Sequence, residues 1–236
     1  MKKVFGLALL LVMLLAFAGA SVASEVAMVR VLHASPDAPA VDVYVNDDLV
    51  LDNVEYKMVS KYLTVPEGTH KVEIYPAGDS ETVVITEQVT VSAGKAYTVA
   101  AIGHLESMRL TALADEKEVT DGNTKIRVAH FSPDAPAVDI ATDTGDVLFP
   151  NAAFSAVTEY LELPEGQYNL QIRAAGTEDV VEELPELELK NGMVYTAVAV
   201  GLLNGEPEFD VILLMDAMRN PDDVPKTGLG GASSVQ

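Results

Sequence analysis

Cysteine and tryptophan are both absent from this sequence of 236 residues, and each absence narrows what the chain can be. Without cysteine there is no disulfide framework, which small exported eukaryotic domains usually need, so a bacterial or archaeal protein with adequate hydrophobic cores fits better. Thiolate ligands for zinc are also missing, and the chain has only the histidines His33, His70, His104 and His130 to replace them. We therefore expect no zinc site.

Basic residues are scarce, with 15 Lys and Arg against 36 Asp and Glu and a formal net charge of -21. A surface this acidic repels phosphate backbones and anionic lipids, so we expect no nucleic-acid partner. With no Trp, 8 Tyr and 6 Phe, an aromatic platform for sugars is also disfavoured. An acidic coat that keeps an exported protein soluble explains the charge.

Three motifs that carry chemistry are missing as well. The sequence contains no Gly-x-Ser-x-Gly nucleophile elbow, no glycine-rich phosphate loop and no Asp-x-Asp-x-Asp-Gly calcium loop. Acidic pairs that resemble a glycosidase site occur by chance among so many carboxylates, so they decide nothing. We expect a protein that is not an enzyme and that holds no cofactor.

The first 23 residues have the order of a secretory signal peptide. Two lysines precede an apolar stretch, and the small residues Ser21 and Ala23 indicate cleavage after Ala23. The alternative is an uncleaved anchor, which would be the only membrane contact, although the apolar stretch is shorter than a bilayer span needs. Later apolar runs, such as residues 194–203, are interrupted by polar residues and glycine. We expect a secreted or cell-surface location.

An internal repeat is the strongest pattern in the sequence. The block Arg-Val-Leu-His-Ala-Ser-Pro-Asp-Ala-Pro-Ala-Val-Asp at residues 30–42 returns as Arg-Val-Ala-His-Phe-Ser-Pro-Asp-Ala-Pro-Ala-Val-Asp at 127–139. Further matches follow in the same order, among them Tyr-Leu-x-x-Pro-Glu-Gly and Tyr-Thr. A period near one hundred residues is a domain duplication rather than a solenoid. The repeat predicts domains at 24–117 and 124–217, joined by a polar, turn-rich seam around 115–123.

Hydrophobic residues inside each copy recur with a period of two. Val41, Val43 and Val45 alternate with polar residues, and the same alternation runs through residues 71–75 and 170–173. This pattern places apolar side chains on one face of a strand. Turn sequences separate about seven such strands per copy, which predicts an all-β protein of two tandem immunoglobulin-like β-sandwich domains. A closed barrel is the alternative architecture.

The repeated block supplies the candidate site residues, and three interpretations of it remain open. A catalytic one is disfavoured, because two prolines bend the chain and no Ser-His-Asp geometry follows from the order alone. In the structural one, Ser35 and Asp37 cap the turn and the histidine satisfies a buried carbonyl. In the third, the loops bind a ligand or calcium through the oxygens of Asp37, Asp42, Asp47 and Asp48. The candidate residues are His33, Ser35, Asp37, Asp42, His130, Ser132, Asp134 and Asp139.

The C-terminal segment is polar and rich in proline and glycine. After the last expected strand, residues 211–215, the sequence turns polar at Asp216 and leads into a tail at 218–236. The tail contains Val224, Pro225, Lys226, Thr227 and Gly228, a sequence similar to the Leu-Pro-x-Thr-Gly signal of sortase substrates. Valine replaces leucine in it, and no apolar span follows, so a chance match remains the alternative.

The repeated block, with the downstream Pro-Glu-Gly and Tyr-Thr elements, closely resembles the domain of unknown function 4397 family. The resemblance covers residues 28–114 and 125–217. It implies exported bacterial or archaeal domains, commonly in tandem and folded as β-sandwiches, and it implies no catalytic residues. We expect a cell-surface or secreted spacer or adhesion module whose surface or extracellular partner is not specified by the sequence. The alternative is an extracellular ligand-binding module, with calcium or without it.

Overall fold

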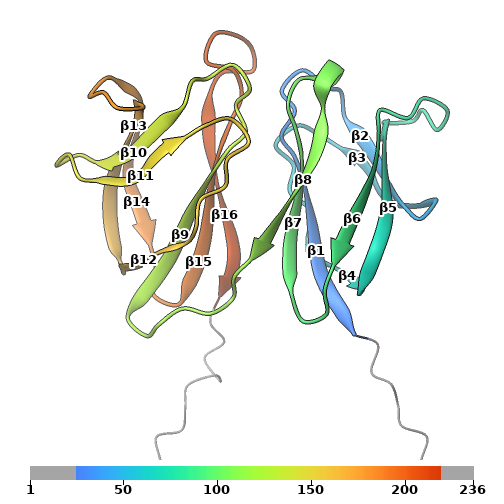
Figure 1. Ribbon diagram of the computed structural model, residues 1–236, viewed down its shortest axis with the longest axis horizontal. Coiled ribbons are helices and arrows are strands. Elements are labelled where there is room, and N and C mark those ends of the chain that lie inside the picture. The colour runs from blue at the N-terminus through green and yellow to red at the C-terminus, as the bar shows by residue number, and fades with distance from the viewer. Residues whose placement is uncertain (1–24, 219–236) are drawn as a thin grey trace, which may run out of the picture.

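The computed structural model describes residues 25–218, which form two similar all-β halves (Figure 1). The first half contains β1 (Val26–His33), β2 (Val41–Val45), β3 (Asp48–Val54), β4 (Leu63–Pro66), β5 (Gly68–Pro76), β6 (Ile85–Val91), β7 (Ala96–Ile102), the 3-10 turn η1 (Leu105–Ser107) and β8 (Arg109–Asp115). The second half contains β9 (Asn123–His130), β10 (Val138–Thr142), β11 (Val147–Ala152), β12 (Leu161–Pro164), β13 (Gly166–Ala174), β14 (Val180–Leu189), β15 (Met193–Val200) and β16 (Asp210–Met218).

Each half is a sandwich of two four-stranded sheets. In the first half, sheet A has the order β4-β1-β7-β8 and sheet B the order β3-β2-β5-β6. In the second half, sheet C has the order β12-β9-β15-β16 and sheet D the order β11-β10-β13-β14. The strands pair antiparallel except that β1 lies parallel to β7, and β9 parallel to β15. The predicted tandem sandwich fold is confirmed, and the four separate sheets exclude the barrel alternative.

Sheets B and D contain the strands whose alternation predicted the fold. Val41, Val43, Val72 and Ile74 are buried, and they form the core of the first sandwich with apolar residues of sheet A. The hairpin between β2 and β3 turns at Asn46 and Asp47, whose φ angles of 52° and 74° are both positive. Asn and Asp tolerate this conformation, and two such residues in succession are what a tight hairpin between twisted strands requires.

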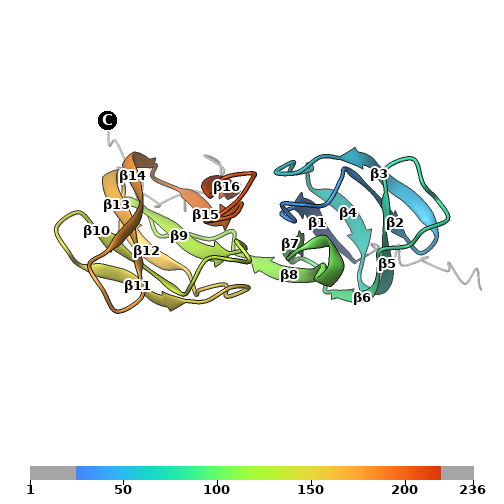
Figure 2. The same cartoon turned by 90° about the horizontal axis from the view of Figure 1, so that it is seen from above.

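Sheets A and C stack on each other, so that the molecule has four layers, with sheets B and D outermost (Figures 1 and 2). Between A and C lies a third hydrophobic core, contributed by both halves. Its buried members are Leu32, Ala34, Ala100, Ile102, Leu113, Ala129, Phe131, Val198, Val200 and Leu214. The sequence predicted two sandwich domains but not this contact, so each sandwich has its own core and both share the interdomain core.

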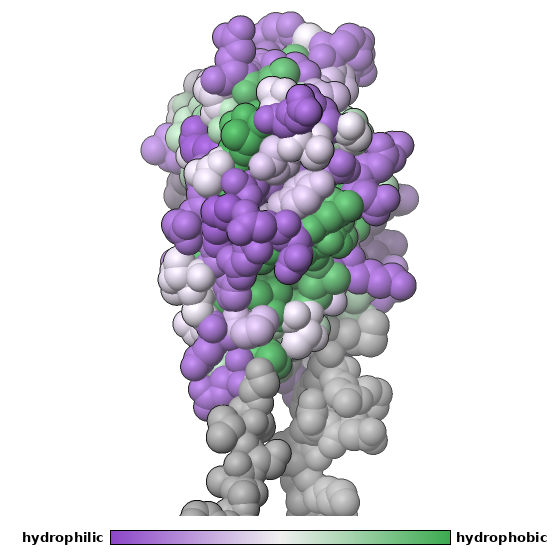
Figure 3. Space-filling view, turned by 90° about the vertical axis from the view of Figure 1, so that its right-hand side faces the viewer, coloured by the Kyte–Doolittle hydropathy of each residue, from purple (hydrophilic) through white to green (hydrophobic). Residues whose placement is uncertain are grey.

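The outer layers face solvent. Figure 3 shows the side of the molecule that carries the first sandwich, where a mostly hydrophilic surface is interrupted by hydrophobic spots. Exposed apolar side chains of this half include Leu49, Val50 and Val83. Scattered exposure of this kind is ordinary for a folded domain. Within residues 25–218, we find no helix of the length and hydrophobicity that crossing a bilayer would require.

The described chain enters and leaves the molecule at the same end. β1 and β9 both run from this end to the opposite one, as do β7 and β15 beside them (Figure 1). The loops at 34–40 and 131–137, which follow β1 and β9, therefore lie together at the far end, with η1 and the loop at 201–209. Strand β16 runs to Met218 and so is longer than the predicted strand at 211–215.

Candidate functional site

The two histidines of the repeated block are buried at the ends of β1 and β9. Both are fully buried, and each donates from Nε2 to a proline carbonyl within its own loop, His33 to Pro39 at 3.0 Å and His130 to Pro136 at 3.1 Å. Burial lowers the pKa of both imidazoles below the ordinary 6.5, although the carbonyl contact opposes the shift. The rings are therefore neutral near pH 7 and hold the loops in place.

The serines of the block do not form a nucleophile and base pair with these rings. The Ser35 backbone N–H donates to Nδ1 of His33 at 3.3 Å, and within residues 25–218 the buried Ser35 hydroxyl has no hydrogen-bond partner. In the second copy, the Ser132 hydroxyl lies 3.4 Å from Oδ1 of Asp134. A serine hydroxyl activated by a histidine requires a direct contact that neither copy provides.

Asp37 and Asp134 connect the loop of the block to the next loop along the same end. Asp37 accepts a hydrogen bond from the Leu105 N–H at 2.8 Å and lies 3.2 Å from Nδ1 of His104. Asp134 accepts from the N–H groups of Leu203 and Asn204, at 2.7 and 2.9 Å. The expectation that Asp37 caps its own turn therefore differs from the structure, in which its carboxylate holds η1.

Asp42 and Asp139 accept hydrogen bonds from two backbone N–H groups each. Asp42 binds those of Asn53 and Gly78, at 2.8 and 3.0 Å. Asp139 binds those of Asn151 and Gly176, at 2.6 and 2.8 Å, and these bonds lower the pKa of its carboxyl group. Each aspartate thus ties its strand to the neighbouring strand, at an asparagine with positive φ, and to one loop.

Three of the four carboxylates of the calcium hypothesis have separate partners. Asp37 holds η1, Asp42 binds one backbone N–H of β3 and one of a loop, and Asp47 pairs with Lys71. Nowhere in residues 25–218 do three or more His, Cys, Asp or Glu side chains come together in an arrangement that could hold a metal ion. The similarity to a sortase signal, residues 224–228, lies outside the described residues.

Replacing both buried histidines should change how stability depends on pH. The unfolded chain binds protons at the ordinary pKa near 6.5, whereas the folded imidazoles bind them only at lower pH. The free energy of unfolding should therefore fall as the pH drops below about 6.5, until the folded-state pKa is reached. The variant His33→Gln/His130→Gln, in which the amide can still donate to the carbonyls, should show a shallower fall in melting temperature between pH 7 and 5.

Asp216 opposes this trend, since burial raises the pKa of its carboxyl group and the folded state then binds a proton more readily than the unfolded one. Both proteins share that contribution, so the difference between their profiles isolates the histidines. Parallel profiles would contradict the buried, neutral state of the rings.

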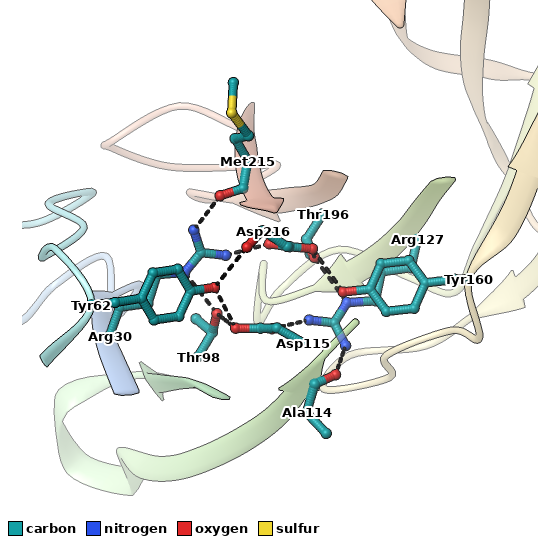
Figure 4. A network of polar contacts seen from close by, with 10 residues as sticks. All are labelled: Arg30, Tyr62, Thr98, Ala114, Asp115, Arg127, Tyr160, Thr196, Met215 and Asp216. Carbon is teal, nitrogen blue, oxygen red and sulfur yellow. Dashed lines mark hydrogen bonds and ion pairs between the residues drawn. The ribbon is translucent and has the colours of Figure 1, made fainter. Parts of the chain in front are cut away.

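A second group of polar residues lies between the halves, in the contact of sheets A and C (Figure 4). Asp115, at the end of β8, accepts hydrogen bonds from Arg127 at 2.5 Å, Thr98 at 2.8 Å and Tyr62 at 2.7 Å. Both side chains of the Arg127–Asp115 ion pair are almost fully buried, with exposed fractions of 4% and 0%. Buried charges need this degree of pairing, because an unpaired one is costly.

Asp216 of β16 has the equivalent partners, with the roles of the two halves exchanged. It pairs with Arg30 and accepts hydrogen bonds from Thr196 at 2.5 Å and Tyr160 at 2.7 Å. Each arginine also stacks over a tyrosine of its own half, with 4.8 Å from Arg30 Cζ to the ring of Tyr62. The same distance in the other half, from Arg127 to Tyr160, is 4.5 Å.

The two ion pairs are reciprocal, since each arginine crosses to the aspartate of the other half. Arg30 also donates to the Met215 carbonyl of the second half, and Arg127 to the Ala114 carbonyl of the first, both at 2.8 Å. Figure 4 shows the two sets facing each other, as a two-fold axis between the halves would place them. The network therefore fixes the orientation of one sandwich on the other.

Chemically, this network holds groups in place and presents no reactive one. Burial and the neighbouring carboxylates raise the pKa of Tyr62 and Tyr160, so both hydroxyls stay protonated and act as donors. The guanidinium groups use their N–H donors on carboxylate, hydroxyl and carbonyl oxygens. A buried network with its partners in place rigidifies the structure around it.

The sequence prediction assigned no buried role to the two aspartates of this network, although its domain bounds include both. Asp115 was placed where the polar seam begins and Asp216 after the last expected strand, whereas both are buried strand residues, 6% and 5% exposed. Arg30 and Arg127 were part of the repeated block, but no role was assigned to them. A signal was available, because an arginine centred between apolar neighbours in both copies indicates a buried partner.

Comparison with known families gives one match that covers most of the chain. Residues 27–141 and 132–224 match the family described as "Domain of unknown function (DUF4397)". No curated protein matches the sequence.

Comparison with solved structures gives several likenesses, and the three that follow are distant. A Bacillus anthracis TIE protein is 14% identical, with a TM-score of 0.25, over 74% of this chain and 33% of that one, so this chain spans about a third of its length. A family CBM26 domain from Eubacterium rectale in complex with maltoheptaose is 8% identical, with a TM-score of 0.25, over 84% and 98%. A putative cell adhesion protein from Bacteroides fragilis is 13% identical, with a TM-score of 0.19, over 82% and 98%. With scores this low, the description of the fold depends on the strand pairing itself.

Proposed function

The chain belongs to the DUF4397 family, and from its geometry we propose that it is an exported, non-enzymatic adhesion module that presents loops on the cell surface. The observation that carries the proposal is the joining of two sandwiches, side by side, by a shared core and two reciprocal ion pairs. Because the described chain enters and leaves at one end, the loops of both repeated blocks face away from it (Figure 1).

This arrangement favours presentation over spacing. A spacer gains reach when the chain enters at one end and leaves at the other, and here β1 begins and β16 ends at the same end. Function commonly lies on loops that a rigid scaffold positions. The loops at 34–40 and 131–137 are held by hydrogen bonds of Asp37 and Asp134, so their shape is fixed before any partner arrives.

The non-enzymatic part of the proposal is supported by how the polar groups are used. The histidines are buried and hydrogen-bonded to carbonyls, and the aspartates of the block bind backbone N–H groups. Export is supported by the leader sequence and by the acidic, cysteine-free composition.

The orientation of the module on a surface tests the proposal. Because the chain has no cysteine, one introduced cysteine gives a single point of attachment. Glu67→Cys lies near the end where the chain enters, since the Glu67 N–H bonds the Glu25 carbonyl, and Glu106→Cys lies on η1 at the loop end. Beads carrying the Glu67→Cys protein, with loops outward, should bind cell-envelope fragments of the source organism at least about tenfold more than beads carrying the Glu106→Cys protein.

Both proteins share every other residue, so each is the control for the other. Equal retention in the two orientations, or no retention in either, would contradict presentation by the loop end.

A further inference from the structure

We propose that a groove beside β8 is a binding site for an extended peptide, which adds as a strand to the free edge of sheet A. The groove has a volume of about 870 Å³ and lies between the halves, away from the loop end. It is bordered by residues 112–118 of the first half and by residues 157–160 and Lys125 of the second. This proposal goes beyond the adhesion function, because it assigns a separate site and a class of ligand.

The direction of the backbone groups along β8 follows from the pairing of sheet A. The Ala34 N–H donates to the Ala101 carbonyl, so odd-numbered residues of β7 point their backbone groups toward β1. Even-numbered residues of β7 then face β8, where Thr98 pairs with Leu113 and Ala100 with Thr111. Because backbone groups alternate along a strand, the even-numbered residues of β8 direct theirs away from β7.

Side chains cover this outer edge at both ends and leave its middle open. The Leu110 N–H donates to Glu87 Oε1 at 3.1 Å, and the Ala114 carbonyl accepts from Arg127 at 2.8 Å. Between these two contacts lie the Leu110 carbonyl, both backbone groups of Ala112 and the Ala114 N–H. All four groups point away from β7, and within residues 25–218 none of them has a hydrogen-bond partner.

The four open groups match one ligand chemistry. An antiparallel strand places one residue opposite Ala112 that bonds both of its backbone groups, and residues two positions away bond Leu110 and Ala114. A peptide of about five extended residues therefore satisfies the window. Proteins usually protect the full length of an exposed strand edge from pairing with other chains. An edge that is covered only at its two ends therefore defines a binding site of limited length.

The groove also has room and a suitable charge for such a peptide. The exposed side chains beside the window, Ala112 and Ala114, are small. Lys125 pairs with Glu116 and Arg127 with Asp115, which leaves Lys95, Lys117, Glu118 and Glu159 at the border, two of each sign. The groove is thus balanced on a chain with a net charge of -21, and a second copy would bring that acidic surface with it. A short peptide without a large net charge is the occupant that fits.

Selection from a random heptapeptide library displayed on phage, with the full chain immobilised, tests the proposal. The wild-type chain should enrich peptides rich in β-branched and aromatic residues, and the variant Ala112→Pro should bind them about tenfold or more weaker. Proline removes the central N–H donor and is tolerated on an edge strand whose N–H faces outward. Ala112→Thr is the matched control, because threonine is similar in size to proline but keeps the backbone N–H donor. This variant should bind the peptides as the wild type does.

Hydrogen exchange of the unmutated chain gives a reading that does not depend on folding of a variant. A selected peptide at saturation should slow exchange of the Ala112 and Ala114 amides and leave those of β6 unchanged. The proposal is overturned if no peptide is enriched, if Ala112→Pro binds the selected peptides as well as Ala112→Thr does, or if the two amides are not protected. Self-association of the wild-type chain that Ala112→Pro abolishes, without peptide binding, would assign the edge to a second copy instead.

Discussion

Replacing Arg30 by Met should lower the free energy of unfolding by about 3–5 kcal/mol, because the buried Asp216 then lacks its counter-ion. The hydrogen bonds that Thr196 and Tyr160 donate to Asp216 remain, but both donors are neutral and do not balance its charge. For a folded unit of this size the loss corresponds to a melting temperature lower by about 2–4 °C per kcal/mol. Urea denaturation followed by circular dichroism measures it directly.

Two further variants separate burial from charge. Lys57 and Asp210 also join the halves, but their side chains are 31% and 52% exposed, so Lys57→Met should cost about 0–1 kcal/mol. In Arg30→Met/Asp216→Leu both charges of the buried pair are gone, and most of the lost stability should return. Equal costs for Arg30→Met and Lys57→Met would show that the buried pair contributes no more than a surface one.

Replacing Phe131 by Ala should uncouple the two halves. Phe131 is fully buried in the interdomain core, and truncating a buried phenylalanine costs about 3–5 kcal/mol. Because the lost contacts are those between the sandwiches, a single calorimetric transition should split into two. The ratio of calorimetric to van't Hoff enthalpy should then rise above one.

Phe149→Ala is the matched control for this experiment. Phe149 is also a buried phenylalanine of the second half, but it belongs to that half's own sandwich core. Its truncation should cost a similar amount and lower the transition temperature while the transition remains single. If both variants split the transition, the interdomain core is not what couples the halves.

The outer strands were predictable from sequence because one of their faces meets solvent. Val41 and Val43 alternate with polar residues, and the structure buries them in the first sandwich. Strands of sheets A and C gave no such alternation, since both of their faces are covered. The run Ala96–Ile102 is almost entirely buried, and a continuous apolar run of this kind is typical of strands with two covered faces.

The partners in the interdomain network could not be predicted from the repeat. Arg30 and Arg127 are 97 residues apart, and Thr98 and Thr196 are 98 apart, so the duplication aligns them. Asp115 and Asp216 are separated by 101 residues, because the preceding loop differs in length between the copies. No pattern in the sequence indicates that each arginine pairs with the aspartate of the other copy, because this pairing depends on how sheets A and C stack.

The crossing of the two arginines makes this tandem equivalent to a homodimer whose subunits were fused. In a homodimer every substitution appears twice, whereas in a fused pair each subunit can diverge while the contact between them is retained. Tyr44 and Tyr75 form a ring pair on the outer face of sheet B, with centroids 5.0 Å apart. The equivalent positions on sheet D are Ala141 and Arg173, so the outer faces differ between the copies, while the buried arginine and aspartate pairs between the halves are the same in both.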